Sequence, residues 1–369
     1  MKYSLVTLAG LLPALFVAPI QAQGTGAPVL TTPGTATWST ELTAGGSRTI
    51  FTITGNTVLD WGQFNLAGGN ELVFDFVGGE SVANLLGSNG TNIIAGNVSS
   101  NGNIAFYSPG ADLLVAGNVI GKSVTLATLR PDPAAGSGGV FTLQGGAGAG
   151  GHLRLTGSVQ ATGGDVILAG ASTQVFNGAR VTATGAVLMA AGTKVTVDSN
   201  RDGAKLRAEG GDGFVLHVGE TRAARIEVAA SREIQNGGRL DVGSKSQRIF
   251  LEIGDGGKIS QTRSAIVIGD LTTNGKIDRD VAITAHDEGD AAVVLSESSL
   301  RIPPVKRPDG SKATKARTIV ISAPTSASAD GGRDRQQQSS QVAKQDKSKP
   351  IFRSSSFFGM RGGKNVEKR

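Results

Sequence analysis

The chain has 369 residues, with 54 glycines and no cysteine, so disulfides, thiolate metal sites and cysteine nucleophiles are excluded. Glycine is about twice as frequent as usual but has no three-residue period, which excludes a collagen-like chain. The net charge of +6 divides into −4 over residues 1–302 (21 Lys and Arg, 25 Asp and Glu) and +10 over residues 303–369 (15 against 5), so the body does not favour nucleic-acid binding.

Residues 1–22 have the pattern of a secretory signal peptide. Lys2 gives a basic start, residues 5–17 are apolar apart from Thr7, and Ile20 and Ala22 precede a cleavage point before Gln23. A buried N-terminal helix is the alternative. No later uncharged apolar run approaches about 18 residues, so we expect no transmembrane segment. Export without cysteine suits a chain that crosses a second membrane unfolded.

Short alternating runs separated by glycine repeat through the body of the chain. Most consist of an aliphatic residue, a glycine and a second aliphatic residue, followed by a glycine-containing corner and an alternating strand. The related glycine pairs are Gly96 with Gly117, Gly157 with Gly178, and Gly238 with Gly257. The spacing within each pair is about 20 residues, and such a period with two or three strands per unit indicates a solenoid.

The fold that best fits these repeats is all-β, a right-handed parallel β-helix of about a dozen coils. Alternation gives each strand one buried face, and glycine allows stacked corners to approach closely. Leucine-rich repeats would require a fixed lattice of Leu and Asn that is missing. A β-sandwich of stacked hairpins is the structural alternative, but it would need more Asn-Gly or Asp-Gly turns.

Residues 35–130 contain the most specific motifs. They are NTVLDWGQFNL at 56–66, GGNELVF at 68–74, VANLLG at 82–87, IIAGNV at 93–98, NGNIAF at 101–106 and SPGADL at 108–113. In this order they resemble the N-terminal secretion domain of two-partner-secreted exoproteins, the filamentous haemagglutinin group. Family motifs of the type W-x-x-F-x-I/L, L-N-R-V-x-G and N-P-N-G-I match here in part, with Asn84 and Pro109 retained in the last two.

The resemblance implies how the chain is organised. Residues 35–200 would be a haemagglutinin-like secretion domain built as a β-helix with N-terminal capping strands, and residues 201–302 would add further coils. The partner would be an outer-membrane β-barrel transporter, and the protein would be secreted or associated with the outer surface of the cell. The secretion and capping positions would be Asn56, Trp61, Phe64, Asn84, Asn101, Gly102 and Pro109.

Trp61 and Phe64 lie three positions apart, so on a regular strand they would face opposite sides. A bulge or cap at Gly62 would bring both over the end of the rod, where an open β edge must be covered. The alternative is that both are ordinary core or half-exposed aromatics.

Catalytic or metal chemistry has few candidates. Acidic and basic residues alternate at Asp198, Arg201, Asp202, Lys205, Arg207, Glu209 and Asp212. They would form either a sugar-acid groove or an exposed loop of mixed charge, and we favour the loop. Residues 278–280 and 286–290 do not match a calcium loop. Residues 145–151 are a glycine-rich loop between coils, and His152 is expected at the surface. We expect no cofactor, no metal and no enzymatic activity.

The repeats end near residue 302. Residues 303–349 have the composition of a basic, disordered linker. Residues 350–369 form an apolar and basic peptide with Phe352, Phe357, Phe358 and Met360, either a docking peptide or a frayed end. The predicted function is a structural or adhesin-like exoprotein that binds a surface glycan or another cell-surface ligand. A β-helical polysaccharide-acting enzyme and a cell-envelope matrix protein retained by its tail remain the alternatives.

Overall fold

The computed structural model describes residues 27–31, 35–88, 90–132, 139–145, 151–244, 246–262 and 265–279, together with the backbone of residues 298–302 and 317–321. These residues form strands and turns, and none of their segments is a helix long and apolar enough to cross a membrane. The predicted signal peptide, the terminal peptide 350–369 and all of 303–349 except one strand lie outside this part of the chain. That strand, β35 (Arg317–Ile321), pairs in antiparallel fashion with β34 (Ser298–Ile302).

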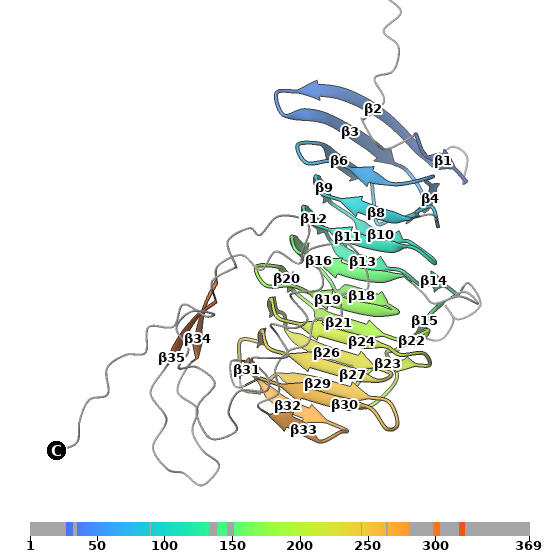
Figure 1. Ribbon diagram of the computed structural model, residues 1–369. Helices are drawn as coiled ribbons and strands as arrows, with labels where there is room; N and C mark the ends of the chain where they lie inside the picture. The colour runs from blue at the N-terminus through green and yellow to red at the C-terminus, as the bar shows by residue number, and fades with distance from the viewer. Residues whose placement is uncertain are drawn as a thin grey trace, which may run out of the picture.

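Three long sheets form the walls of the molecule (Figure 1). Sheet A contains, in spatial order, β1 (Val29–Leu30), β4 (Thr57–Asp60), β7 (Ser81–Leu85), β10 (Asn103–Tyr107), β13 (Ser123–Ala127), β18 (Val166–Gly170), β21 (Ala186–Ala191), β26 (Arg225–Ala230), β29 (Arg248–Ile253) and β32 (Asp270–Thr273). Sheet B contains β2 (Ala36–Thr43), β3 (Gly46–Ile53), β6 (Glu71–Phe76), β9 (Asn97–Ser100), β12 (Asn118–Gly121), β17 (Ser158–Ala161), β20 (Arg180–Ala183), β25 (Glu220–Arg222), β28 (Arg239–Asp241) and β31 (Ile266–Ile268). Sheet C contains β5 (Asn65–Leu66), β8 (Thr91–Ile94), β11 (Asp112–Val115), β16 (His152–Leu155), β19 (Ser172–Val175), β24 (Phe214–His217), β27 (Glu233–Asn236), β30 (Lys258–Gln261) and β33 (Ile277–Arg279).

The chain visits sheets B, A and C in turn, and each visit to all three makes one coil of a parallel β-helix. Coil 1 is β3, β4 and β5, and coil 9 is β31, β32 and β33. Asn97 aligns with Asn118, and Glu220 with Arg239, so successive coils repeat at the spacing of the sequence pattern. The predicted β-helix is therefore confirmed, with nine described coils rather than about a dozen.

The N-terminal end of the helix is closed by two strands that run against the others. β1 pairs in antiparallel fashion with β4, and β2 forms an antiparallel hairpin with β3. These two strands, called here the N-terminal cap, cover the first edges of sheets A and B (Figure 1). The expected capping strands are thus present, and they precede the first coil.

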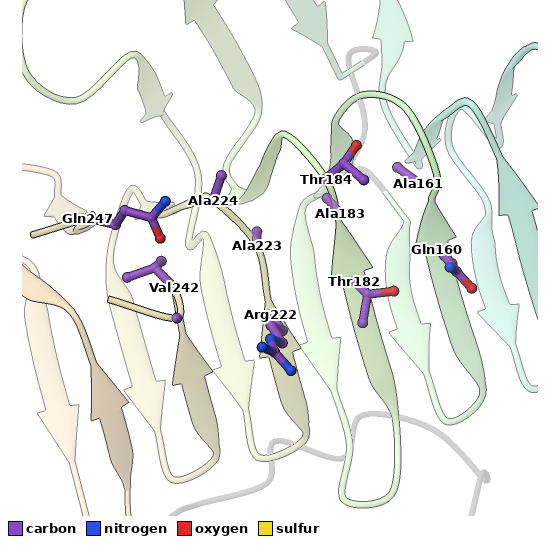
Figure 2. A pocket seen from close by; sticks show the side chains of 11 residues that line it. Gln160, Ala161, Thr182, Ala183, Thr184, Arg222, Ala223, Ala224, Val242 and Gln247 are labelled. Carbon is purple, nitrogen blue, oxygen red and sulfur yellow. The ribbon is translucent and has the colours of Figure 1, made fainter. Parts of the chain in front are cut away.

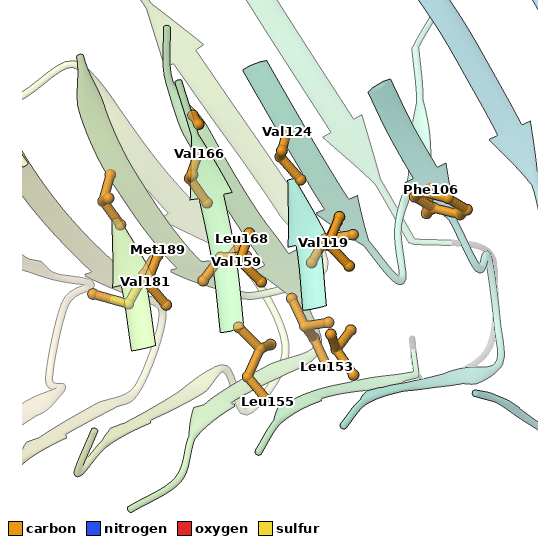
Figure 3. Close-up of a cluster of buried hydrophobic side chains, with 14 of the residues drawn as sticks. Phe106, Val119, Val124, Leu153, Leu155, Val159, Val166, Leu168, Val181 and Met189 are labelled. Atoms are coloured by element: carbon orange, nitrogen blue, oxygen red, sulfur yellow. The ribbon is translucent and has the colours of Figure 1, made fainter. Parts of the chain in front are cut away.

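The interior is a continuous apolar column. Inward positions alternate with outward ones along each strand, as in β3, where every second residue is buried. Figure 3 shows side chains from the three walls converging, among them Val124 and Leu168 from sheet A, Val119 and Val159 from sheet B, and Leu153 from sheet C. Each coil buries its aliphatic residues against the coils above and below, which accounts for the high content of Val, Ile and Leu.

Glycines stack at the corner between sheets C and B. A Cβ on Gly117 would lie 1.9 Å from the carbonyl oxygen of Gly96, and one on Gly157 would lie 2.0 Å from that of Gly117. Only glycine allows so close an approach. The next residue in this column is Ala179 rather than Gly178, because β17 and β20 align Ser158 with Arg180.

The predicted pairing of Gly238 with Gly257 was wrong. Gly238 lies in this corner, directly over the carbonyl oxygen of Gly219, whereas Gly257 precedes β30 at the corner between sheets A and C. The two glycines stand at similar places in similar sequences, but the corners themselves are different.

Two coils contain insertions that build a fourth sheet. Asn118 aligns with Ser158, and Arg180 with Glu220, so coils 4 and 6 are about twice the usual length. The added segments form sheet D, an antiparallel sheet of β14 (Arg130–Pro131), β15 (Val140–Gln144), β22 (Lys194–Asp198) and β23 (Leu206–Glu209).

Sheet D packs on the outside of sheet A. Its buried Leu143, Val195 and Leu206 form a second apolar cluster with alanines of sheet A, including Ala169 and Ala229. The sequence did not predict this sheet, and the residues around 201–209 expected in an exposed loop or in further coils belong in part to it.

Candidate functional site

The residues that carry the family resemblance lie together in coils 1 to 3, next to the N-terminal cap. Five aromatic rings fill this end of the interior: Phe51, Trp61, Phe64, Phe74 and Phe106. Phe51 stacks on Phe74 with ring centroids 5.3 Å apart, and Trp61 meets Phe64 edge to face at 5.0 Å. Such pairs add roughly 0.5–1.5 kcal/mol each beyond burial alone. The N-terminal end is therefore a rigid aromatic block.

Trp61 and Phe64 both point inward because the chain turns between them. β4 ends at Asp60 and β5 begins at Asn65, so residues 61–64 form the corner between sheets A and C. The expected bulge or cap at Gly62 was wrong, and the alternative of core aromatics is correct. The end of the rod is instead covered by the N-terminal cap.

Asn84 anchors the indole of Trp61. It is fully buried in β7, and its Oδ1 accepts a hydrogen bond from Trp61 Nε1 at 2.9 Å. Its Nδ2 donates to the carbonyl oxygen of Ala105 on the next coil at 3.1 Å. One amide thus joins three successive coils at their centre, where a polar group must be fully paired.

A second buried amide, Asn92, was missed by the sequence analysis. Its Oδ1 accepts from the backbone N–H of Phe64 at 2.9 Å, and its Nδ2 donates to Gly87 O and to Ser108 Oγ, both at 2.8 Å. The signal was present in the sequence TNII, because strand alternation places Asn92 on the same buried face as Ile94.

Asn56 and Asn101 bind the backbone of a neighbouring coil at the corners between sheets B and A. Asn56 Oδ1 accepts from the N–H and the hydroxyl of Ser81, at 3.0 and 3.2 Å. Asn101 Oδ1 accepts from Phe76 N at 2.8 Å, and its Nδ2 donates to Phe76 O at 3.2 Å. Gly102 is required beside it, since a Cβ there would lie 2.5 Å from the ring of Phe76.

Pro109 occupies a tight turn between sheets A and C. Ala111 N donates to Ser108 O at 3.2 Å, and Gly110 has a φ of +80°. This is the arrangement of a type II turn, with proline second and glycine third. The buried Ser108 hydroxyl donates to Ala111 O at 3.1 Å and accepts from Asn92, which ties the turn to the buried amide network.

The N-terminal cap also carries most of the exposed large apolar side chains of the described residues. Trp38 and Leu42 on β2 are 41% and 68% exposed, and Val29 on β1 is 67% exposed. β2 is the outermost strand of sheet B, so one edge of its backbone has no partner among the described residues. An unpaired edge with apolar side chains is a template for adding a strand from another chain.

The acidic residues of the alternative sugar-acid groove are spread over several elements. Asp212 pairs with Arg232 at 2.9 Å and Glu209 with Lys194 at 3.7 Å, while Asp198 accepts from the backbone N–H of Asn200 at 3.0 Å. Asp202 is exposed. No cluster of three or more potential metal ligands occurs within the described ranges.

The basic residues of the same region fasten sheet D to the rod. Arg201 binds both carboxylate oxygens of Glu252 on β29, at 3.1 and 3.2 Å, and Arg207 lies 3.9 Å from the same group.

Glu227 is the most deeply buried carboxylate of this region, and its sequence position did not reveal it. It is 1% exposed and accepts from the backbone N–H groups of Lys205 and Leu206, at 2.7 and 2.8 Å. Arg225 pairs with Glu227 and stands 4.5 Å over the ring of Phe250. Glu227 thus holds the segment before β23 against sheet A through two backbone hydrogen bonds, and we call this contact a clamp.

Two histidines lie within the described residues. His152 is half-buried rather than at the surface, with Nδ1 2.6 Å from Ser172 Oγ. His217 is buried between Asn236 Oδ1 and Thr221 Oγ1, both at 2.9 Å. Burial lowers the pKa of His217 to about 4, against the opposing effect of the Asn236 hydrogen bond, so the ring is neutral at pH 7.

The predicted docking residues of the tail, Phe352, Phe357, Phe358 and Met360, lie outside the described residues, as do residues 286–290. Their roles stay predictions.

Comparison with known protein families and with curated proteins finds no match. Among solved structures, the protein is similar to the HMW1 secretion domain from Haemophilus influenzae, with 17% sequence identity and a TM-score of 0.44 over 70% of this chain and 73% of that one. That structure is itself a secretion domain, the class of protein that the motifs of residues 56–113 resemble.

Proposed function

We propose that the protein is a secreted β-helical exoprotein with a structural or adhesive role, exported through an outer-membrane β-barrel that recognises its N-terminal end. The observation that carries this proposal is the position of the secretion-like motifs. They converge in coils 1 to 3, where Asn84 and Asn92 join three coils to the aromatic block. Such a rigid end is suited to recognition by a partner.

The N-terminal cap supplies the recognition surface. Its β2 edge offers backbone N–H and C=O groups, and Trp38 and Leu42 offer apolar contacts on the same strand. A transporter segment that added a strand to β2 would gain both. The transporter would then recognise the unpaired edge of β2 rather than a linear sequence signal.

The role outside the cell is proposed to be mechanical and interfacial, without catalysis. Of the carboxylates at residues 198–212, Glu209 and Asp212 lie in exposed ion pairs, Asp198 accepts a backbone hydrogen bond from Asn200, and Asp202 is exposed. The nine described coils present repeated side-chain rows on their outer faces. The protein would act at or beyond the outer surface of the cell.

Export is tested in the native host by measuring the full chain in the medium and in the cells. Leu42→Ser changes an exposed side chain on the β2 edge, and Ile120→Ser, on β12, is the matched control at a distant strand of the same sheet. We expect Leu42→Ser to lower the secreted fraction about tenfold, the effect of losing ~1.4 kcal/mol of binding.

Ile120→Ser should be secreted like the parent, and both variants should accumulate to the parent's total amount. Equal secretion of all three proteins would refute recognition through the β2 edge. If the unmodified chain stayed in the periplasm, export itself would be wrong.

A further inference from the structure

A hollow of about 340 Å³ lies beside sheet B, where the chain passes from sheet B to sheet A in coils 5 to 8 (Figure 2). Its origin is a difference in corner length. The corner has four residues in coil 5 (162–165) and six in coil 8 (242–247), but only two in coil 6 (184–185) and two in coil 7 (223–224). Two short corners between two longer ones leave a depression that runs across the coils.

The floor of the hollow is apolar and its margins are polar. Small side chains, Ala161, Ala183 and Ala223, form the floor with Val242. The polar lining groups are the side chains of Gln160, Thr182, Thr184, Arg222 and Gln247. Among the described residues, none of these five side chains has a hydrogen-bond partner, so their donors and acceptors are available to a ligand.

Arg222 is the one arginine of this face that is left without an ion pair within the described ranges. Its neighbours form a closed row: Arg180 pairs with Glu220 at 3.2 Å, Glu220 lies 3.8 Å from Arg239, and Arg239 pairs with Asp241 at 2.6 Å. With Arg222 included, this face carries three arginines and two carboxylates. Figure 2 shows Arg222 on β25 in line with Thr182 and Gln160 on the neighbouring strands.

Asp241 is the cross-strand neighbour of Arg222, and their charges attract, but no hydrogen bond or ion pair joins the two side chains within the described ranges. Its carboxylate already binds Arg239 and the backbone N–H of Gly243, the latter at 2.8 Å. Burial opposes ionisation of Asp241, but these hydrogen bonds and the charges of Arg239 and Arg222 hold its pKa below the usual value. The carboxylate therefore stays ionised within the row, and Arg222 lines the hollow without an ion pair within the described ranges.

We propose that this hollow binds a carboxylate-bearing sugar, such as one uronic acid unit of an acidic glycan, with Arg222 as the anion anchor. A guanidinium matches a carboxylate with two parallel hydrogen bonds. Amide and hydroxyl side chains suit the ring hydroxyls, and the alanine floor suits the apolar face of a sugar ring. The lining offers only one cation and no aromatic ring, which disfavours a polyphosphate or a nucleobase.

The size and direction of the hollow agree with this ligand. Small-molecule sites span about 300–1,000 Å³, and this hollow is at the lower end of that range. It crosses β17, β20, β25 and the corner after β28, so a polymer could continue along the rod on either side. The site names a ligand class for the adhesive role proposed above, but its test uses purified protein and does not depend on export.

The test is calorimetric titration of the purified full chain with trigalacturonate, with the neutral trisaccharide maltotriose as the ligand control. The net charge of +10 in residues 303–369 will attract any polyanion, so the variants must be matched in charge. Arg222→Gln removes the anchor, and Arg232→Gln removes an exposed charge elsewhere, where Arg232 pairs with an exposed Asp212. Ala224→Phe keeps Arg222 and fills the hollow.

We expect Arg222→Gln and Ala224→Phe each to weaken trigalacturonate binding about tenfold or more, and Arg232→Gln to weaken it less than about twofold. Maltotriose should bind no variant measurably. Equal weakening by Arg222→Gln and Arg232→Gln would show binding by net charge and overturn the proposal. Absence of trigalacturonate binding to the unmodified chain, or equally strong maltotriose binding, would also overturn it. None of these outcomes bears on whether the protein is exported.

Discussion

Replacing Asn92 by alanine should loosen the N-terminal coils selectively. The side chain makes three hydrogen bonds in a fully buried position, to Phe64 N, Gly87 O and Ser108 Oγ. Ser108 keeps its own acceptors, but the N–H of Phe64 and the carbonyl of Gly87 lose their partner. An orphaned buried group costs about 1–3 kcal/mol; the N–H of Phe64 is buried and the carbonyl of Gly87 is part-buried, so the expected loss is about 3 kcal/mol.

The loss should remain local, because each coil of a solenoid contacts only its neighbours. Hydrogen exchange of the full chain, followed by mass spectrometry, measures this directly. Peptides that cover residues 57–66 should exchange about 100-fold faster in Asn92→Ala, as expected for about 3 kcal/mol. Peptides that cover residues 225–253 should be unchanged.

Asn97→Ala is the matched control, since Asn97 is exposed and its side chain accepts only from Asn118 at 2.9 Å. It should change the free energy of local opening in the first coils, as measured by hydrogen exchange, by less than about 0.5 kcal/mol. The reasoning would be refuted if the two variants exchanged alike, or if Asn92→Ala accelerated exchange evenly along the rod.

Buried polar contacts give three further predictions. Trp61→Phe should keep the aromatic packing but orphan Oδ1 of Asn84, and chemical denaturation should show a loss of about 1–2 kcal/mol in the N-terminal coils. Burial lowers the pKa of His217 to about 4, so the unfolded chain takes up the proton first as the pH falls below about 6.5. The free energy of unfolding, measured by denaturant titration, should therefore drop by about 2 kcal/mol between pH 7.5 and pH 5. The His217→Gln variant should lack this drop. Glu227→Gln should weaken the clamp on residues 199–205, and limited proteolysis should cut that segment faster than in the parent, with unchanged cleavage contradicting the clamp.

Much of the fold could be predicted because its determinants are local. Alternation within each strand and small residues at the stacked corners, such as Gly96 and Gly117, recur at short intervals and need no knowledge of distant partners. The aromatic block was visible as Trp61 and Phe64, but its geometry was not, because the sequence does not show whether the chain turns or bulges at Gly62. The burial of Asn92 could have been predicted from strand alternation alone, since it lies two positions before the buried Ile94.

Sheet D could not be predicted, for a physical reason. Its strands, such as VFTLQ at 140–144 and KVTVD at 194–198, alternate like those of the coils, so their pattern does not say which sheet they join. Their pairing depends on two insertions that the helix brings to the same side. The hollow at Arg222 has a similar origin, because it depends on a difference in corner length between coils rather than on a motif.

Sheet D also sets the order in which the molecule can be completed. β15 and β22 pair Gln144 with Lys194, so an early strand must wait for a partner that is made only after the whole of coil 5. Until then, the apolar outer face of sheet A, which includes Ala127 and Ala169, lacks the cover of β22 and β23. A chain that emerges from a membrane N-terminus first would wind its coils in sequence yet pause with this flank open. Residues 194–209 would then complete sheet D and cover this face. Only after that step would the first half of the rod become resistant to unwinding.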